Sequence, residues 1–219
     1  WIRALRRAEA PLSYSQGFHP HPKVAFSAAL PQNQASLGEY MDVTLTQRMD
    51  PILLLARLAS TLPAGFGAHA VTEMPAGAPS LMSIALGGKF TAVFADLSSD
   101  QLERRVADML SQDEIMVERR VKKRQGRQRR LKSSKIADIR PLILSLTQRP
   151  GTSVVDLVIM STPDLRGKAR EVFDLLADDP ARVLVIKQDS LTLRNGSWES
   201  ISAGWARQDT HVDAPSPSA

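Results

Sequence analysis

The chain carries its excess positive charge in one short segment, and this segment restricts how the rest can fold. Between Glu118 and Lys135, ten lysines and arginines stand against one glutamate, a local balance of +9. The formal net charge of the whole chain is +5, so the other residues together carry about −4. Burying unpaired charges is very costly. We therefore expect the segment to lie outside any core, at the tip of a β-hairpin that projects from a sheet.

The remaining composition is that of a folded, non-membrane protein. Of the 219 residues, 43% are hydrophobic and 23% are charged, close to globular averages. No apolar stretch reaches the roughly 18 residues that a membrane span needs. We expect a cytoplasmic protein without a membrane partner.

The chain contains no cysteine. This excludes disulfides, thiolate metal sites, a cysteine nucleophile and a cysteine-held iron–sulfur cluster within the chain. Phosphate-binding glycine loops, dinucleotide fingerprints and serine-nucleophile motifs are also missing from the sequence.

Hydrophobic periodicity and capping residues predict alternating strands and helices. We expect helices at 1–8, 50–62, 99–110 and 163–176, and strands at 24–29, 39–46, 66–74, 89–94, 115–121, 139–147, 153–160 and 182–193. In the second half this order is typical of a ferredoxin-like fold, in which two helices cover one face of an antiparallel sheet.

We therefore predict an α+β protein with two tandem ferredoxin-like (βαββαβ) domains and antiparallel sheets. The first domain covers residues 1–78 and lacks its opening strand and helix start. The second covers 79–200 and includes the basic hairpin 118–135, and 201–219 form a flexible tail.

The run Arg3–Ala8 and the loop Pro11–Lys23 resemble a bacterial family known as the radical-SAM-linked, or radical-SAM-associated, domain of unknown function. The likeness continues at Phe26, Leu30-Pro31, Ser36, Glu39–Asp42 and Ile139–Pro141. The resemblance implies a domain fused to, or encoded beside, a radical S-adenosylmethionine enzyme. S-adenosylmethionine and an iron–sulfur cluster are then expected only in a partner, with no cofactor and no metal in this chain.

The same loop and the tandem architecture also look like the CRISPR repeat-processing endoribonucleases, which bind RNA with paired ferredoxin-like domains. This second resemblance is architectural, and fold analogy does not transmit function.

The basic segment has the charge density needed to displace counterions from a phosphate backbone. Because it contains no aromatic residue, we expect it to recognise RNA by shape rather than by base stacking. An acidic surface of a partner protein would satisfy the same charges. The predicted nucleic-acid-binding residues are Arg119, Arg120, Lys122, Lys123, Arg124, Arg127, Arg129, Arg130, Lys132 and Lys135.

The loop before the first strand is stiffened by Pro20 and Pro22 and offers two imidazoles. His19 and His21 are weak candidates for acid–base catalysis or metal binding, and a zinc site would need a third ligand. The predicted substrate or partner loop comprises Arg6, Arg7, Ser15, Gln16, Gly17, His19, His21 and Lys23.

The leading hypothesis from the sequence is a non-catalytic RNA-binding or substrate-presenting module that serves a radical S-adenosylmethionine enzyme in RNA modification or processing. The alternatives are a metal-independent endoribonuclease that uses His19 or His21, and a protein-docking adaptor.

Overall fold

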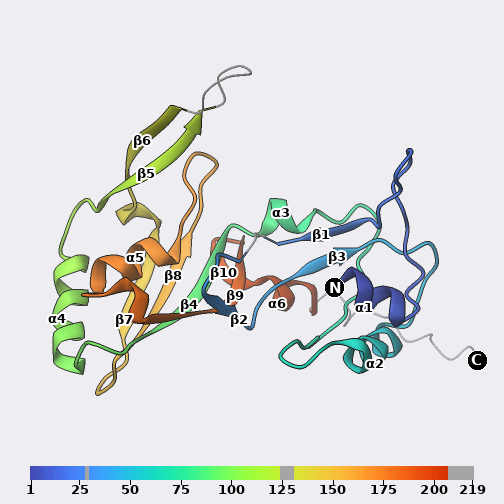
Figure 1. Cartoon of the computed structure of the whole chain (residues 1–219), viewed down its shortest axis with the longest axis horizontal. Coiled ribbons are helices and arrows are strands. Elements are labelled where there is room, and N and C mark those ends of the chain that lie inside the picture. The colour runs from blue at the N-terminus through green and yellow to red at the C-terminus, as the bar shows by residue number, and fades with distance from the viewer. Residues whose placement is uncertain (28–29, 124–130, 207–219) are drawn as a thin grey trace, which may run out of the picture. The chain divides into compact units, whose positions relative to one another are not determined.

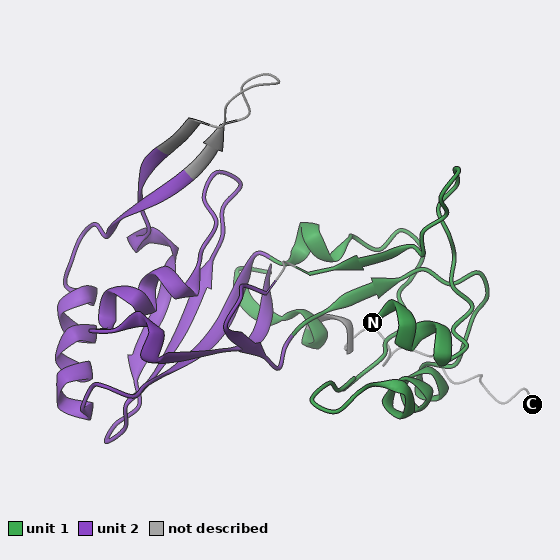
Figure 2. Ribbon diagram, viewed as in Figure 1, with its two compact units in different colours: residues 1–29, 39–85, 194–219 green, residues 30–38, 86–193 purple. Residues whose placement is uncertain are grey.

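The computed structural model describes residues 1–27, 30–123 and 131–206, and for 121–123, 131–133 and 204–206 it describes the backbone alone. The chain forms two compact units, coloured separately in Figure 2. Unit 1 comprises Trp1–Ala29, Glu39–Ala85 and Arg194–Ala219, and unit 2 comprises Leu30–Gly38 and Leu86–Leu193. The sequence placed one boundary at 78; the structure divides the chain at 85 and assigns 30–38 to unit 2.

Unit 2 is built on an antiparallel sheet with the strand order β9-β4-β8-β7 (Figure 1). Its strands are β4 (Gly87–Phe94), β7 (Ile143–Gln148), β8 (Val154–Met160) and β9 (Val183–Arg194), and the short β2 (Gln34–Ser36) runs parallel to β9. Helix α4 (Ser99–Leu110) follows β4, and α5 (Ala169–Leu176) follows β8. In chain order, the four strands of the main sheet and these two helices are therefore β4-α4-β7-β8-α5-β9.

Both helices contribute to one hydrophobic core on the sheet. Val106 of α4, Phe173 of α5 and Leu157 of β8 belong to the same buried cluster. The rings of Phe94 and Phe173 meet edge to face, with centroids 6.2 Å apart. A capping box at Ser98, with Gln101 as its reciprocal partner, explains why α4 begins there.

The basic segment does not connect two strands of the main sheet. Strands β5 (Met116–Lys123) and β6 (Leu131–Asp138) pair with each other as a separate antiparallel ladder, which extends away from the sheet in Figure 1. The expected strand at 115–121 is therefore present, but it lies in this ladder. In chain order, the next strand of the main sheet after β4 is β7. It starts later than predicted, after a short 3₁₀ turn at Arg140–Leu142.

Unit 1 has its own core between helices and a two-stranded ladder. Its elements are α1 (Ile2–Arg7), β1 (Val24–Phe26), β3 (Met41–Val43), α2 (Pro51–Thr61), α3 (Leu81–Ile84), β10 (Ser197–Ser200) and α6 (Ile201–Ala206). Leu5 of α1 and Leu58 of α2 are buried in one cluster. Asp50 accepts hydrogen bonds from the backbone N–H groups of Ile52 and Leu53 and so caps α2, close to the helix start predicted at 50.

The structure is α+β with antiparallel sheets, as predicted, but two tandem ferredoxin-like domains are not confirmed. Within the described residues of unit 1, β1 and β3 pair as a two-stranded ladder, and the expected strand at 66–74 is wrong. This segment lacks a ladder partner in the described chain and instead packs Ala68 and Val71 against the core. Strand-like composition alone cannot supply that partner.

Two further boundaries differ from the prediction. Helix α5 begins at Ala169 rather than near 163, because side-chain hydroxyls of the preceding loop bind backbone N–H groups in a non-helical conformation. Ile201–Ala206, predicted as part of a flexible tail, form α6 with Ile201 buried. The rest of that tail, 207–219, lies outside the described residues.

The acid stability of unit 2 is expected to depend on one ion pair at the sheet. Arg149 binds both carboxylate oxygens of Asp156 at 2.7 and 2.9 Å, and Thr91 donates a third hydrogen bond at 2.7 Å. The bonds from Arg149, helped by Thr91 and opposed by burial, hold the pKa of Asp156 below its ordinary value of 3.8. This stabilisation is therefore complete above pH 3.8 and is lost as the pH falls toward the lowered pKa.

We predict that Asp156→Asn lowers the free energy of unfolding at pH 7 by about 1 kcal/mol or less, because solvent partly screens the pair. The deficit relative to the unsubstituted protein should shrink as the pH is lowered below 3.8. Urea unfolding across a pH series measures both values. A deficit that stays constant down to pH 2 would contradict the assignment.

Candidate nucleic-acid interface

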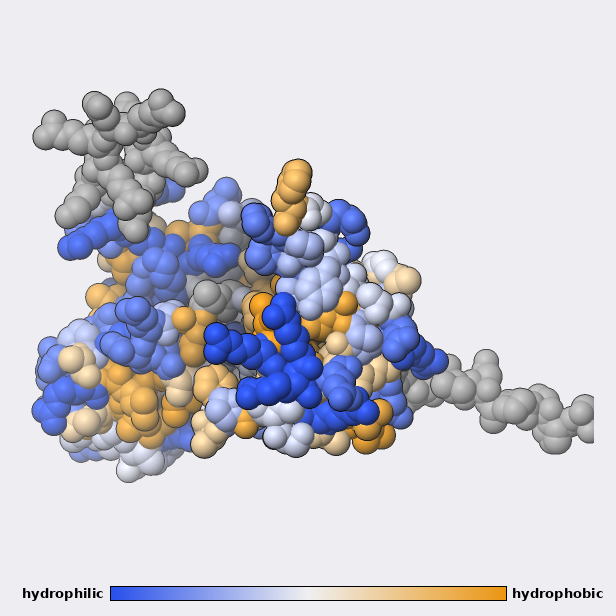
Figure 3. All heavy atoms as spheres, turned by 45° about the vertical axis from the view of Figure 1, so that its right-hand side comes forward, coloured by the Kyte–Doolittle hydropathy of each residue, from blue (hydrophilic) through white to orange (hydrophobic). Residues whose placement is uncertain are grey.

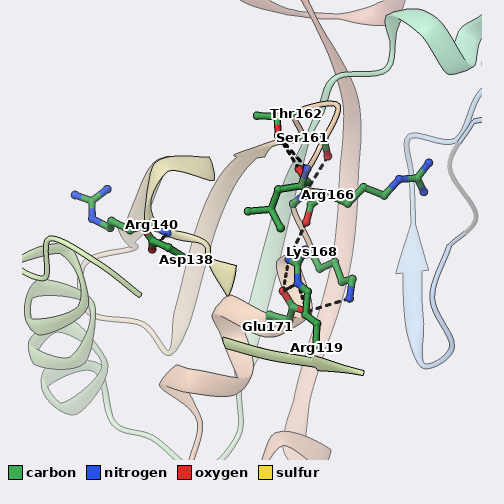
Figure 4. Close-up of polar contacts among 10 residues, drawn as sticks. Arg119, Asp138, Arg140, Ser161, Thr162, Arg166, Lys168 and Glu171 are labelled. Atoms are coloured by element: carbon green, nitrogen blue, oxygen red, sulfur yellow. Dashed lines mark hydrogen bonds and ion pairs between the residues drawn. The ribbon is translucent and has the colours of Figure 1, made fainter. Parts of the chain in front are cut away.

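The base of the β5–β6 hairpin is anchored by Arg119, the first residue of the basic run. Its Nε lies 3.0 and 3.2 Å from the two carboxylate oxygens of Glu171, and one Nη lies 2.6 Å from Oε2 (Figure 4). The same guanidinium donates to the backbone oxygen of Arg166 at 2.8 Å. Only 13% of the Arg119 side chain and 21% of the Glu171 side chain is exposed. Arg119 therefore supports the hairpin and is largely withdrawn from solvent.

The loop before α5 places these acceptors. Ser161 Oγ accepts the N–H of Gly167, and Thr162 Oγ1 accepts the N–H of Leu165, both at 3.0 Å. A Cβ at Gly167 would collide with the backbone oxygen of Met160, so the close approach of this loop to β8 requires glycine. Glu171 then lies in the first turn of α5, where a carboxylate is favoured by the helix dipole.

The end of β6 is fixed by Asp138. Its Oδ1 accepts the backbone N–H groups of Ile115 and Arg140, at 2.8 and 2.9 Å. The Arg140 side chain in turn donates to the backbone oxygens of Gln112 and Leu110, beyond the end of α4 and in its last turn. Contacts with the rest of unit 2 thus fix the hairpin where β5 begins and where β6 ends.

Beyond this base the ladder carries charge without a matching row of acids. Arg120 and Lys135 are exposed. Lys122 and Lys132 are Cα partners in the register, and like charges at directly opposed positions destabilise a ladder. The register also includes Lys123, whose partner is Leu131. Arg124, Arg127, Arg129 and Arg130, which the sequence also predicted to bind nucleic acid, lie outside the described residues.

The loop predicted as a substrate or partner site is held as a narrow turn in unit 1. The N–H of Ser15 donates to the backbone oxygen of His21 at 2.8 Å, and Ser15 Oγ accepts the N–H of His21 at 3.0 Å. Tyr14 and Pro22 form a bridge, and the N–H of Lys23 bonds to the oxygen of Ser13. The loop therefore has a fixed base. In Figure 1 it rises from unit 1 between α1 and β1.

At the tip of this loop the side chains point outward. Gln16, His19, His21 and Lys23 are exposed, and Gly17 has φ +134°, a conformation that favours glycine. No hydrogen bond to either imidazole is found among the described residues. These residues also contain no group of three histidines or acids that could hold a metal ion.

The arginines of α1 are exposed but are not joined to the loop. No hydrogen bond or ion pair joins the side chains of Arg3, Arg6 or Arg7 to the described part of the chain. Their helix is positioned by Ala4 and Leu5, which are buried against α2.

Sequence reasoning missed two residues that matter here. Glu171, 52 positions after Arg119, gave no local signal because only the tertiary fold brings the two together. Phe18 stands within the predicted loop but was not singled out, although it is 102% exposed. The described helices are all too short or too polar to cross a membrane.

We predict that Glu171→Gln loosens the hairpin. The change leaves the Arg119 guanidinium withdrawn from water without its carboxylate, which should cost about 1–3 kcal/mol of stability. Amide hydrogen exchange should accelerate in Met116–Lys123 and Leu131–Asp138. Asp178→Asn, which removes the more exposed ion pair to Arg105, is the matched control and should cost less than about 1 kcal/mol. Equal exchange rates in the two variants would show that Glu171 does not anchor the hairpin.

A second prediction concerns the loop of unit 1. Ser15→Ala removes the hydroxyl that accepts the N–H of His21, so amide exchange at 16–21 should rise while the global stability falls by about 1 kcal/mol or less. Ser60→Ala in α2, which removes another exposed hydroxyl contact, should leave the loop unchanged. Unaltered exchange in Ser15→Ala would mean that the prolines and the remaining backbone bond between Ser15 and His21 hold the turn without the hydroxyl.

Comparison with known proteins places the chain in a family. No curated protein and no solved structure matches it. A family model described as an uncharacterized protein conserved in bacteria (DUF2344) matches residues 1–169, which is well over half of the chain. The protein therefore belongs to this bacterial family.

Proposed function

We propose that the protein is an RNA-binding, substrate-presenting accessory module that works with a radical S-adenosylmethionine enzyme in RNA modification or processing. The single observation that carries this proposal is the anchored basic hairpin. Arg119 and Asp138 fix its base with internal partners. Apart from Arg119, the two strands carry the basic residues Arg120, Lys122, Lys123, Lys132 and Lys135 against the acids Glu118 and Asp138.

A polyanion would relieve the repulsion within this ladder. Opposed lysines at 122 and 132 weaken an isolated hairpin, and phosphates placed against them would turn that cost into attraction. Because the ladder already holds its backbone in place, little ordering would be required when an RNA backbone docks. Basic side chains alone grip phosphates and carry little base specificity, which favours a structured RNA recognised by shape.

The architecture of unit 2 is compatible with this role. We infer that unit 2 is a ferredoxin-like domain, because its strand order and its two helices on one sheet face follow the βαββαβ scheme, with the basic hairpin inserted after the first helix. Fold alone does not transmit function, so the hairpin rather than the fold supports RNA binding.

The link to a radical S-adenosylmethionine enzyme rests on the family resemblance and on cysteine content. A cysteine-held iron–sulfur cluster would have to come from another chain or from another part of a longer one, since these 219 residues contain no cysteine. In this proposal the hairpin holds the RNA, and the exposed loop of unit 1 contacts the substrate or the partner enzyme.

Salt-dependent binding tests the hairpin directly. We predict that the double variant Arg120→Gln, Lys135→Gln binds a structured RNA more weakly, with a plot of log affinity against log salt less steep by about 2, because two phosphate contacts are lost. The matched control Arg104→Gln, Arg182→Gln removes the same charge from exposed positions elsewhere in unit 2 and should keep the original slope. Arg119 is left intact because its loss would disturb the fold.

Three results would overturn the proposal. They are equal slopes for the two double variants, affinity that is independent of salt, and no measurable binding at low salt. Cleavage of the RNA by the protein alone, abolished by His19→Ala with His21→Ala, would replace the accessory role by an endoribonuclease.

A further inference from the structure

The most exposed aromatic side chain of the described structure is Phe18, at the tip of the loop in unit 1. Its relative exposure is 102%, so it makes essentially no contact with its own chain. A fully exposed phenyl ring keeps its whole apolar area in water, which is unfavourable relative to burial. On the face shown in Figure 3, apolar side chains lie exposed among hydrophilic ones.

The ring is carried on a turn that cannot collapse to bury it. Two reciprocal bonds between Ser15 and His21 close the turn, and the bridge between Tyr14 and Pro22 extends it toward β1. Gly17, with φ +134°, sets the backbone directly before the ring. The ring is therefore held out by the loop geometry, which lowers the entropy that a ligand would have to remove.

The residues near Phe18 in the sequence suit a nucleotide ligand, which combines a base with a phosphate group. From Ala10 to Gly38 the chain contains no acidic residue. The exposed polar side chains of the same loop are an amide, two imidazoles and an ammonium group, from Gln16, His19, His21 and Lys23. The nearest acids after this stretch are engaged, because Glu39 accepts a bond from Ser27 and Asp42 accepts the N–H of Leu81.

Aromatic residues are also gathered in this part of the chain. Of its two tyrosines and six phenylalanines, Tyr14, Phe18 and Phe26 lie within thirteen consecutive positions, and their exposures are 37%, 102% and 45%. Exposed rings beside cationic and hydrogen-bonding groups, without carboxylates, are typical of proteins that bind single-stranded nucleic acid. A protein-docking hot spot would instead surround the ring with other apolar side chains, and 15–17 and 19–23 supply none apart from proline.

We infer that Phe18 is a stacking residue for an unpaired base in a single-stranded segment of RNA, with the amide and cationic groups of the loop contacting its edges and phosphates. This site rests on the proposed function in taking RNA as the ligand, but it is distinct from the hairpin in both residues and chemistry. It gives the protein a reader of unpaired bases, whereas the hairpin contacts the phosphate backbone.

A short unstructured oligouridylate, labelled for fluorescence anisotropy, is the probe. Phe18→Ala should weaken its binding about 5- to 150-fold, the range that loss of one base stack produces. Phe18→Leu should lose nearly as much, because it keeps apolar area but lacks a π face. Phe18→Trp should retain binding, and its added fluorescence should be quenched on titration, as a difference from the signal of the three native tryptophans.

The controls separate stacking from other effects. Phe66→Ala removes another exposed phenyl ring, one in edge contact with Trp1, and should leave oligonucleotide binding unchanged. Because Phe18 contacts nothing in its own chain, thermal unfolding of the Phe18 variants should match that of the unsubstituted protein, so a loss of binding reports the site itself.

Unchanged binding by Phe18→Ala overturns the inference, and full binding by Phe18→Leu overturns stacking in favour of a merely apolar contact, as a protein partner would use. The Arg120→Gln, Lys135→Gln variant, titrated with the same oligonucleotide, distinguishes the two proposals. If the Phe18 variants bind the oligonucleotide more weakly but the Arg120→Gln, Lys135→Gln variant binds structured RNA normally, the stacking site is supported and the hairpin proposal is wrong. If only the hairpin variant loses binding, the hairpin proposal is supported and the stacking site is wrong.

Discussion

The contact between Arg119 and Glu171 is the one on which the arrangement of the basic segment depends. A hairpin of mutually repelling residues gains little from its own ladder, and β5 and β6 pair with no strand of the main sheet. Its position must therefore come from its base. The Arg119 guanidinium fixes the base by binding the Glu171 carboxylate and a backbone oxygen together. Because the guanidinium is largely withdrawn from water, these charge-assisted hydrogen bonds are strong. One basic residue is thus used to support the others.

The two candidate binding elements share a physical design. Each is fixed at its base by a few polar contacts, through Arg119 and Asp138 in unit 2 and through Ser15 in unit 1. Each also carries exposed groups, the basic residues Arg120 and Lys135 in one case and the phenyl ring of Phe18 in the other. Ordering before binding reduces the entropic cost of association. Such pre-organisation is what a module that presents a substrate requires.

Sequence reasoning succeeded where the signal was local. Helix starts were predicted at 50 and 99, and the structure caps these helices with Asp50 and Ser98, through bonds that join residues only two or three positions apart. It failed where the deciding partner was distant. The segment 66–74 has strand composition but no ladder partner in the described chain, whereas Gln34–Ser36, not predicted as a strand, pairs with β9 about 150 positions later. The helix expected at 163 starts at Ala169 because Thr162 and Ser161 bind the intervening N–H groups.

The amino-acid sequence by itself determined that positive charge is concentrated at 118–135, that no cysteine chemistry is possible within these residues and that a proline-stiffened, acid-free loop lies near the start. These are properties of composition and order, which folding cannot change. Only the tertiary structure decided that Arg119 forms an ion pair with Glu171, that β5 and β6 form a separate ladder and that Phe18 is fully exposed. Each of those outcomes depends on which residues, distant in sequence, occupy the neighbouring space, and local patterns carry no record of that.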